Sequence, residues 1–259
     1  MTPADHLWIN AATAIALMTG VWIISVLVRN ASIIDIAWGP GFAIIAWISF
    51  GLDDPAGISC WLLPALATAW GLRLGVYLAS RNLGKAEDFR YRAMRDRHGS
   101  AFAWKSWYRV FQLQAAIMWV VSLPLQMGVA HSARDWQAWH VIGIVVWAIG
   151  FLFESIGDFQ LARFKRIPEN ANRVMDRGLW RYTRHPNYFG DFLVWWGLWL
   201  VAAAEPAARW TIISPVIMSI FLLRISGVPM LESALRKTKD GYTDYVKRTR
   251  AFFPWRPRA

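Results

Sequence analysis

A dense group of polar side chains lies between residues 178 and 191, where a basic segment meets a Trp-rich apolar run. Its eleven positions from 181 to 191 hold Arg181, Tyr182, Arg184, His185, Asn187, Tyr188 and Asp191. Pro186 predicts the first turn of a helix, where its missing N–H costs nothing. Unpaired N–H groups at a helix start and nearby guanidinium groups both bind anions. This stretch therefore predicts an anion site at the entry to an apolar helix.

Residues 158–166 and 242–254 also bring cations together with other polar or aromatic side chains. Asp158 and Lys165 are seven residues apart, so a helix would place them near one face, and cations at its end would suit its dipole. Snorkelling of these cations at a membrane surface is the open alternative. The segment 242–254 is basic and aromatic. It suits either closure over a phosphate-bearing ligand or anchoring to anionic lipids.

Ionisable residues also occur inside apolar runs, at Asp35, Arg73 and Glu154. Such residues are functional candidates by default, although a structural pair between Asp35 and Arg73 is equally open. Five scattered histidines and one cysteine, Cys60, show no metal-ligand spacing. No Gly-rich phosphate loop follows a strand. Any nucleotide would therefore be bound by a helical fold.

Long apolar runs must position these groups. Hydrophobic residues make up 56% of the chain and Trp occurs 18 times, against about 45–50% apolar residues in soluble proteins. Seven runs are long enough to be spans of roughly 20 residues: about 7–28, 33–51, 58–80, 110–130, 137–160, 187–204 and 209–228. We predict an all-α polytopic membrane protein, a seven-helix bundle forming one domain over residues 1–259. The second run contains Gly39-Pro40-Gly41 and is expected to be short or broken.

The net charge of +11 does not indicate nucleic-acid binding, because its distribution follows the apolar runs. Lys and Arg lie in 81–109, 163–184 and 224–258, with four exceptions at Arg29, Arg73, Arg134 and Arg209. This is the positive-inside pattern. It predicts an outside N-terminus, an outside acidic turn at Asp53-Asp54 and a cytoplasmic C-terminus. The first apolar run lacks a signal-peptide pattern and is interpreted as a span.

Several of these motifs together resemble one family. They are Gly178-Leu-Trp-Arg-Tyr-Thr-Arg-His-Pro-Asn-Tyr-Phe-Gly-Asp191, Gln160-Leu-Ala-Arg-Phe-Lys-Arg166, Asp35-Ile-Ala-Trp-Gly39, Asp88-Phe-Arg-Tyr91, and the basic segment through Tyr245 and Phe253-Pro254. The chain resembles bacterial membrane homologues of steroid 5α-reductases, of the DUF1295 type, over most of its length. The Arg-His-Pro-Asn-Tyr core is shared with sterol reductases and isoprenylcysteine carboxyl methyltransferases, so it is specific for a superfamily rather than a reaction.

The resemblance implies a bacterial inner-membrane 3-oxo-5α-steroid 4-dehydrogenase of steroid and lipid metabolism. NADPH would bind from the cytoplasm, and a 3-oxo-Δ4 steroid or related enone would enter from the bilayer. Hydride would pass to C5 while a hydrogen-bond donor polarises the 3-keto oxygen. A methyltransferase using S-adenosylmethionine is the alternative enzyme, and a non-catalytic lipid-binding protein is the third hypothesis. The cations around 163–184 favour a phosphate-bearing dinucleotide, because S-adenosylmethionine has no phosphate.

The resemblance also assigns residues. Cofactor contacts are expected from Asp158, Arg163, Lys165, Arg181, Tyr182, Arg184, His185, Asn187, Tyr188, Asp191, Tyr245 and Arg248, with Asn187 holding the nicotinamide amide. Mammalian relatives hold the keto group with a glutamate and a tyrosine, whose positions here fall at Trp38 and Trp70. These two become expected substrate contacts, and Asp35, Arg73 and Tyr91 become candidates for the polarising group. No oligomeric state is predicted.

Overall fold

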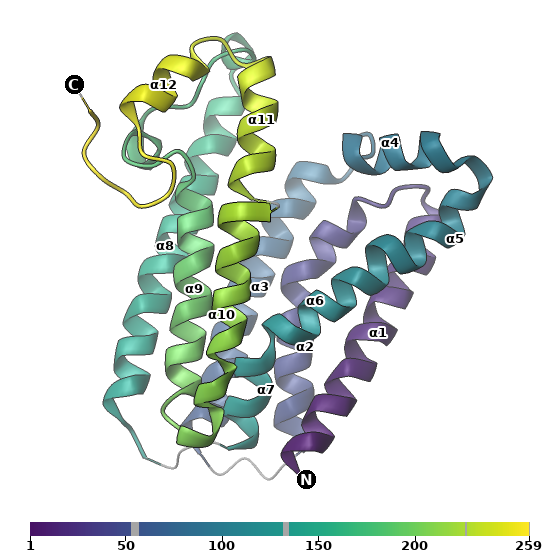
Figure 1. The fold of residues 1–259 in the computed structure, drawn as a ribbon, viewed down its shortest axis with the longest axis vertical. Coiled ribbons are helices and arrows are strands. Elements are labelled where there is room, and N and C mark those ends of the chain that lie inside the picture. The colour runs from purple at the N-terminus through teal and green to yellow at the C-terminus, as the bar shows by residue number, and fades with distance from the viewer. Residues whose placement is uncertain (53–56, 132–134, 226, 259) are drawn as a thin grey trace. The chain divides into compact units, whose positions relative to one another are not determined.

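The computed structural model describes residues 1–52, 57–131, 135–225 and 227–258. Every regular element within these ranges is helical (Figure 1), which confirms the all-α prediction. The chain divides into two compact units, Met1–His140 with Val201–Ser214, and Val141–Leu200 with Pro215–Ala259. The predicted acidic turn at Asp53-Asp54 and Arg134 lie outside the described residues. One domain over residues 1–259 stays a prediction.

The described residues contain five helices long and apolar enough to cross a membrane, and a sixth if one bent pair is a single span. The five are α1 (Pro3–Leu27), α2 (Ile33–Leu52), α3 (Ile58–Asn82), α8 (Ala138–Lys165) and the segment Pro206–Thr238, and the bent pair is Phe89–Val121 with Leu123–Ala130. α9 (Pro186–Ala202) has 17 residues, the lower end of the range of about 17–25 that spans a bilayer. These helices indicate a membrane-embedded protein, and the count of seven spans stays a prediction.

The first unit is built around the contact between α2 and α3. A Cβ atom on Gly71 would lie 2.3 Å from the Gly39 carbonyl oxygen, so the two backbones touch. Pro40 packs beside Gly75 at the same crossing. α2 runs unbroken from Ile33 to Leu52 with Pro40 inside it, so the expected break is absent. The packed neighbour supports the turn that the proline ring weakens.

Shorter elements complete this unit. They are α4 (Phe89–His98), the 3₁₀ turn Gly99–Ala101, α5 (Phe102–Ser106), the π-helical turn Trp107–Gln112, α6 (Leu113–Val121), α7 (Leu123–Ala130) and the 3₁₀ helix Pro206–Ile212. α1, α6 and α7 pack on α2. The basic segment 81–109 is therefore largely helical.

The second unit contains α8, α9 and the elements that follow them. The remaining members are the 3₁₀ turns Pro168–Asn170 and Gly178–Arg181, α10 (Ile213–Ile220), the π-helical turn Phe221–Ile225, α11 (Val228–Thr238) and α12 (Tyr242–Arg248). Gly190 of α9 meets Gly150 of α8, and Gly197 meets Trp147. These contacts show that the two helices run antiparallel, and they lie side by side in Figure 1.

Alanine at Gly190 is expected to separate α8 from α9. Its Cβ would lie 2.4 Å from the Glu154 backbone nitrogen and 2.6 Å from the Gly150 carbonyl oxygen, and backbone atoms cannot move aside as a side chain can. We expect a loss of about 1–3 kcal/mol, larger than the gain of up to about 1 kcal/mol from removing a helical glycine. Thermal unfolding in detergent measures this effect. Gly20→Ala is the control, since no atom lies within 4 Å of its Cβ position; equal behaviour of both variants would contradict the close contact.

Candidate functional site

A polar seam crosses the contact between α8 and α9. The Nδ2 atom of Asn187 donates to the Oδ1 atom of Asp158 at 3.2 Å, and Asp158 is buried. Glu154, one turn earlier on α8, is also buried, and Asp191 follows Asn187 by one turn on α9. The Oδ1 atom of Asn187 is buried and has no hydrogen-bond partner among the described residues. An amide acceptor is therefore available between two otherwise apolar helices, where such groups mark functional sites.

The loop before α9 is tied to the end of α8. Gly178 has φ 59° and starts the 3₁₀ turn. The backbone N–H of Leu179 donates to Gln160 Oε1, and the Trp180 indole donates to the Gly157 carbonyl, each at 3.0 Å. α9 then begins at Pro186, as predicted. The end of α8 and the loop before α9 are thus held against each other.

Arg184 joins three segments inside the unit. Its Nε and Nη2 atoms lie 2.8 and 2.7 Å from Glu232 Oε1. Its Nη1 atom donates to the carbonyl oxygens of Thr249 at 2.6 Å and Val246 at 3.3 Å. The side chain is 9% exposed. The guanidinium group therefore connects the start of α9 with α11 and the end of α12.

His185 shares the same carboxylate. Its Nε2 atom lies 3.1 Å from Glu232 Oε1, and its ring stacks on Tyr188 with centroids 5.5 Å apart. Burial lowers the pKa of His185, against the hydrogen bond with Glu232, which raises it. A carboxylate can only accept, so the neutral ring carries its proton on Nε2. The buried Nδ1 atom is then an acceptor, with no hydrogen-bond partner among the described residues.

Residues 250–255, which we call the strap, lie along residues 182–184. The Arg184 N–H donates to the Arg250 carbonyl at 2.9 Å, and the Trp255 N–H donates to the Tyr182 carbonyl at 3.0 Å. The Thr183 hydroxyl donates to the Phe252 carbonyl at 2.7 Å. The strap therefore covers the start of α9, where residues 183–186 are all buried.

Aromatic contacts hold the strap from its other side. Phe252 and Phe253 pack on Phe189 and Phe192 of α9, with centroids 5.6 to 6.0 Å apart. Upstream of the strap, the hydroxyl of Tyr245 donates to the Trp180 carbonyl. The basic aromatic segment thus folds onto the loop before α9.

Some members of the expected cofactor set have partners within the protein. Arg184, His185 and Tyr245 each form internal hydrogen bonds, and their contacts with a cofactor stay a prediction. The exposed members of the set are Arg163, Lys165, Arg181, Tyr182 and Arg248. Among them Arg248 forms an exposed ion pair with Asp176 at 3.6 Å.

Two of the three predicted catalytic residues meet in the first unit. The Tyr91 hydroxyl donates to Asp35 Oδ1 at 3.3 Å, and Arg90 Nη2 lies 3.5 Å from Asp35 Oδ2. Arg90 also pairs with Asp88 at 2.8 Å, so this carboxylate and phenol are fixed by charged neighbours. The third candidate, Arg73, lies half-buried on α3.

The predicted substrate contacts Trp38 and Trp70 belong to an aromatic cluster. Their rings flank Phe42, with centroids 5.1 and 5.9 Å from it. Trp70 is fully buried. Its position is that of a packed core residue between α2 and α3, while Trp38 is partly exposed. No cluster of three or more metal-ligating side chains occurs in the part of the chain that the structure describes.

One protein-family profile matches most of the chain. The profile of DUF1295, a protein family of unknown function, matches residues 21–249. The chain belongs to the DUF1295 family. The uncharacterized protein C594.04c of Schizosaccharomyces pombe is 25% identical over 219 residues, which cover 74% of this chain and 63% of that protein. This DUF1295 chain thus spans less than two thirds of that relative's length, and no solved structure matches it.

Glu232 and Arg90 contact predicted site residues of this DUF1295 protein, although neither was among the expected site residues. Both lie within the family match, as do the Asn187–Asp158 and Asp35–Tyr91 pairs. Glu232 carried a usable signal, since it is the only acidic residue between 206 and 239. A lone carboxylate beside many cations predicts an ion pair. Arg90 is one of many exposed arginines and carried no comparable signal.

Proposed function

We propose that this DUF1295 protein is an NADPH-dependent reductase that acts on the Δ4 double bond of 3-oxo-Δ4 steroids or a related membrane-soluble enone. One observation carries the proposal: Asn187 is held by Asp158 with its own carbonyl oxygen buried and unpaired among the described residues. An unpaired buried acceptor costs free energy unless a ligand uses it. The donor that fits it is an N–H group, such as that of a carboxamide.

The residues present fit a phosphorylated dinucleotide. Asp158 accepts one hydrogen of the Asn187 amide and so fixes which way its oxygen faces. Arg163, Lys165 and Arg181 are exposed, and cations of this kind bind phosphate oxygens in charge-assisted hydrogen bonds. NADPH, when bound, supplies the hydride that an enone takes up at C5.

In the first unit, the same proposal makes Tyr91 the candidate hydrogen-bond donor to a 3-keto oxygen. A preplaced donor lowers the barrier because negative charge develops on that oxygen. Asp35 accepts the Tyr91 hydrogen bond and is itself held by Arg90. Arg73 is the alternative donor. The partly exposed Trp38 supplies apolar surface for a lipophilic substrate, and the buried Trp70 supports it from behind through Phe42.

The charge pattern supports a location in a bacterial inner membrane, with the N-terminus outside and the C-terminus cytoplasmic. Lys and Arg concentrate in 81–109, 163–184 and 224–258, and such segments remain on the cytoplasmic side. Arg163, Lys165 and Arg181 then face the compartment that holds NADPH.

The decisive assay uses the purified full chain in detergent with NADPH and progesterone. The proposal expects nicotinamide absorbance to fall only when the steroid is present, and expects NADPH to take up energy from excited tryptophans, of which the chain has 18. A parallel reaction contains S-adenosylmethionine and a prenylcysteine. Methyl transfer without NADPH binding would favour the methyltransferase, and binding of neither compound would remove both enzymatic interpretations.

Lys165→Ala is expected to raise the Kd for NADPH about fivefold and to change the Kd for NADH little. The reason is that an exposed ammonium–phosphate pair is worth up to about 1 kcal/mol, and only NADPH carries the 2′-phosphate. Titration of tryptophan energy transfer with each cofactor measures the ratio. Lys85→Ala removes the same charge from an exposed position in the other unit and should leave both affinities unchanged. Equal losses for the two cofactors in Lys165→Ala would show that this lysine does not read the 2′-phosphate.

A further inference from the structure

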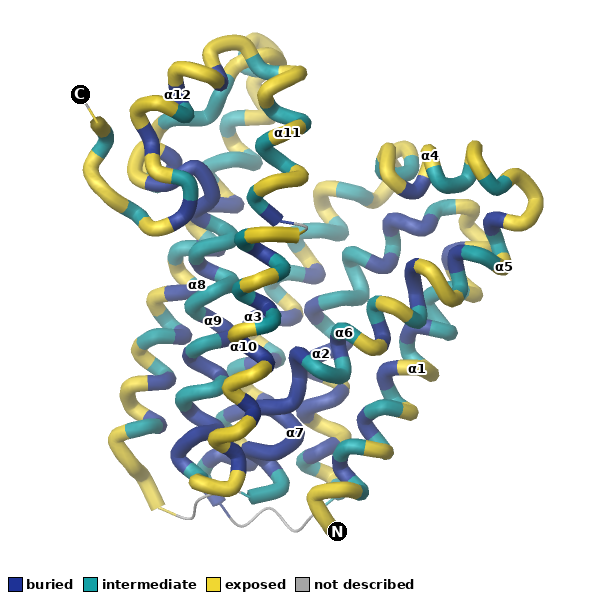
Figure 2. The backbone as a smooth tube through the Cα atoms, in the orientation of Figure 1, coloured by how far each residue is buried: buried dark blue, intermediate teal, exposed yellow. Residues whose placement is uncertain are grey.

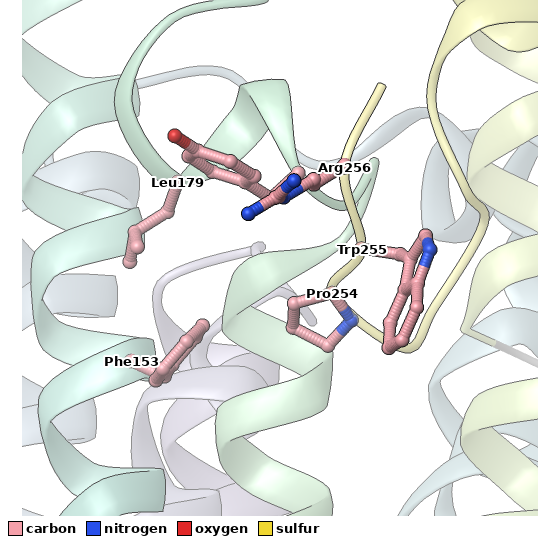
Figure 3. Close-up of a pocket in the computed structure, with 6 residues that line it drawn as sticks. Phe153, Leu179, Pro254, Trp255 and Arg256 are labelled. Carbon is pink, nitrogen blue, oxygen red and sulfur yellow. The ribbon is translucent and has the colours of Figure 1, made fainter. Parts of the chain in front are cut away.

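An apolar groove of about 290 Å³ opens in the second unit (Figure 3). Its lining residues come from α8, the loop before α9, the strap and the residue that follows the strap: Phe153, Leu179, Tyr182, Pro254, Trp255 and Arg256. Arg256 supplies the only charged group of this lining set, and Tyr182 the only hydroxyl. The groove is therefore an apolar hollow with a single cation on its wall.

The surface next to this groove is suited to lipid. Ile149, Leu152 and Ile156 on α8 are 43–54% exposed and follow one another at helical spacing beside Phe153. Figure 2 shows exposed positions recurring along α8. Such a stripe on a helix long and apolar enough to cross a membrane faces acyl chains. Trp255 is 68% exposed, and tryptophan and arginine together are typical of the headgroup region. The groove thus extends the lipid-facing side of α8 toward the headgroups.

Contacts between and behind the lining residues hold the groove in shape. The Trp255 N–H donates to the Tyr182 carbonyl at 3.0 Å, which joins the two walls. Phe253 packs on Phe189, and Phe189 packs on Phe153, with centroids 6.0 and 5.3 Å apart. A ligand therefore enters a formed hollow and need not order the strap first.

We propose that this groove binds one anionic phospholipid. An acyl chain lies against Phe153, Leu179 and Pro254, and the phosphate pairs with the Arg256 guanidinium group. Charge complementarity selects this occupant, because a guanidinium group binds a phosphate through two parallel hydrogen bonds. Apart from the Tyr182 hydroxyl, the remaining lining residues offer apolar contact. An anionic headgroup is favoured over a zwitterionic one, which brings its own cation beside the phosphate.

The test compares phosphatidylglycerol with phosphatidylcholine of identical acyl chains. Each is added to the purified full chain in detergent, and retained lipid is counted by native mass spectrometry. The wild-type chain is expected to retain phosphatidylglycerol preferentially, and Arg256→Ala to lower that preference by about fivefold, since one arginine near a membrane surface contributes about 1 kcal/mol. Arg258→Ala is the matched control, because it removes the same charge from an exposed residue two positions on that does not line the groove. Leu179→Trp, which fills the groove, should reduce retention of both lipids.

Three results would overturn the proposal. Equal effects of Arg256→Ala and Arg258→Ala would show general charge attraction without a site. Unchanged retention in Leu179→Trp would show that lipid binds elsewhere. A loss of NADPH affinity in Arg256→Ala with lipid retention intact would assign this arginine to a dinucleotide. Failure of the NADPH assay itself leaves the lipid result unaffected, because no step of the lipid test uses NADPH.

Discussion

Asn187→Ala is expected to lower NADPH-dependent turnover by about 100-fold or more while the helical fold is retained. The amide is the group that fixes the reacting end of the cofactor in the proposed site, and loss of such positioning costs on the order of 10²-fold. Steady-state rates with progesterone measure the effect, and circular dichroism checks the fold. Asn172→Ala is the control, because Asn172 is exposed and its backbone carbonyl, which accepts from Asp240, is kept.

Variants of Asp158 separate orientation from charge. Asp158→Asn keeps an oxygen that can accept from Asn187, so it should retain most turnover if Asp158 serves only to orient the amide. Asp158→Leu removes the acceptor and should approach the loss seen in Asn187→Ala. Asp191→Ala, one turn further along α9, should also abolish turnover. Wild-type rates in Asn187→Ala and Asp191→Ala would contradict the assignment of this seam as a cofactor site.

Glu232→Ala is expected to destabilise the second unit by about 3 kcal/mol. It leaves the Arg184 guanidinium, 9% exposed, without its carboxylate, and removing one partner of a buried pair costs about 3–5 kcal/mol. It also removes the hydrogen bond of His185 Nε2. The midpoint of thermal or denaturant unfolding in detergent measures this change.

A double variant shows whether the cost comes from the unpaired charge. Arg184→Met with Glu232→Leu removes both charges, so it should be more stable than Glu232→Ala alone. Asp244→Asn breaks the exposed pair between Asp244 and Lys247 and is expected to leave stability unchanged, as exposed pairs contribute little. A double variant less stable than the single one would show that the network contributes more than charge compensation.

The helices themselves follow from the sequence, because an apolar run in a membrane must satisfy its backbone internally. The predicted runs at 7–28, 33–51, 58–80 and 137–160 match α1, α2, α3 and α8 closely. The run at 110–130 was less well predicted, since Ser122 separates α6 from α7 and the helices bend by 43°. Pro40 led us to expect a break in α2 that the structure does not have. The contacts of α2 with Gly71 and Gly75 of α3 cannot be predicted from the α2 segment alone.

The sequence indicated which residues gather at the start of α9 but only part of the contacts that they make. The pairing of Asn187 with Asp158 was within reach, because both lie near the ends of neighbouring apolar runs. The role of Arg184 was not, because its partners Glu232, Val246 and Thr249 are 48 to 65 residues away in sequence. From the sequence alone, a cation next to the start of a helix is interpreted as a ligand contact, because acceptors far away in the sequence cannot be identified. The hydrogen bond from Tyr245 to the Trp180 carbonyl also joins residues far apart in sequence.

The long separation between Arg184 and its acceptors has a consequence for biosynthesis. α9 leaves the ribosome well before Val246 and Thr249 are translated, so a nascent chain carries an uncompensated guanidinium group at the membrane surface during that interval. Substitutions that misfold residues 249–255 would therefore reduce the amount of protein that escapes degradation.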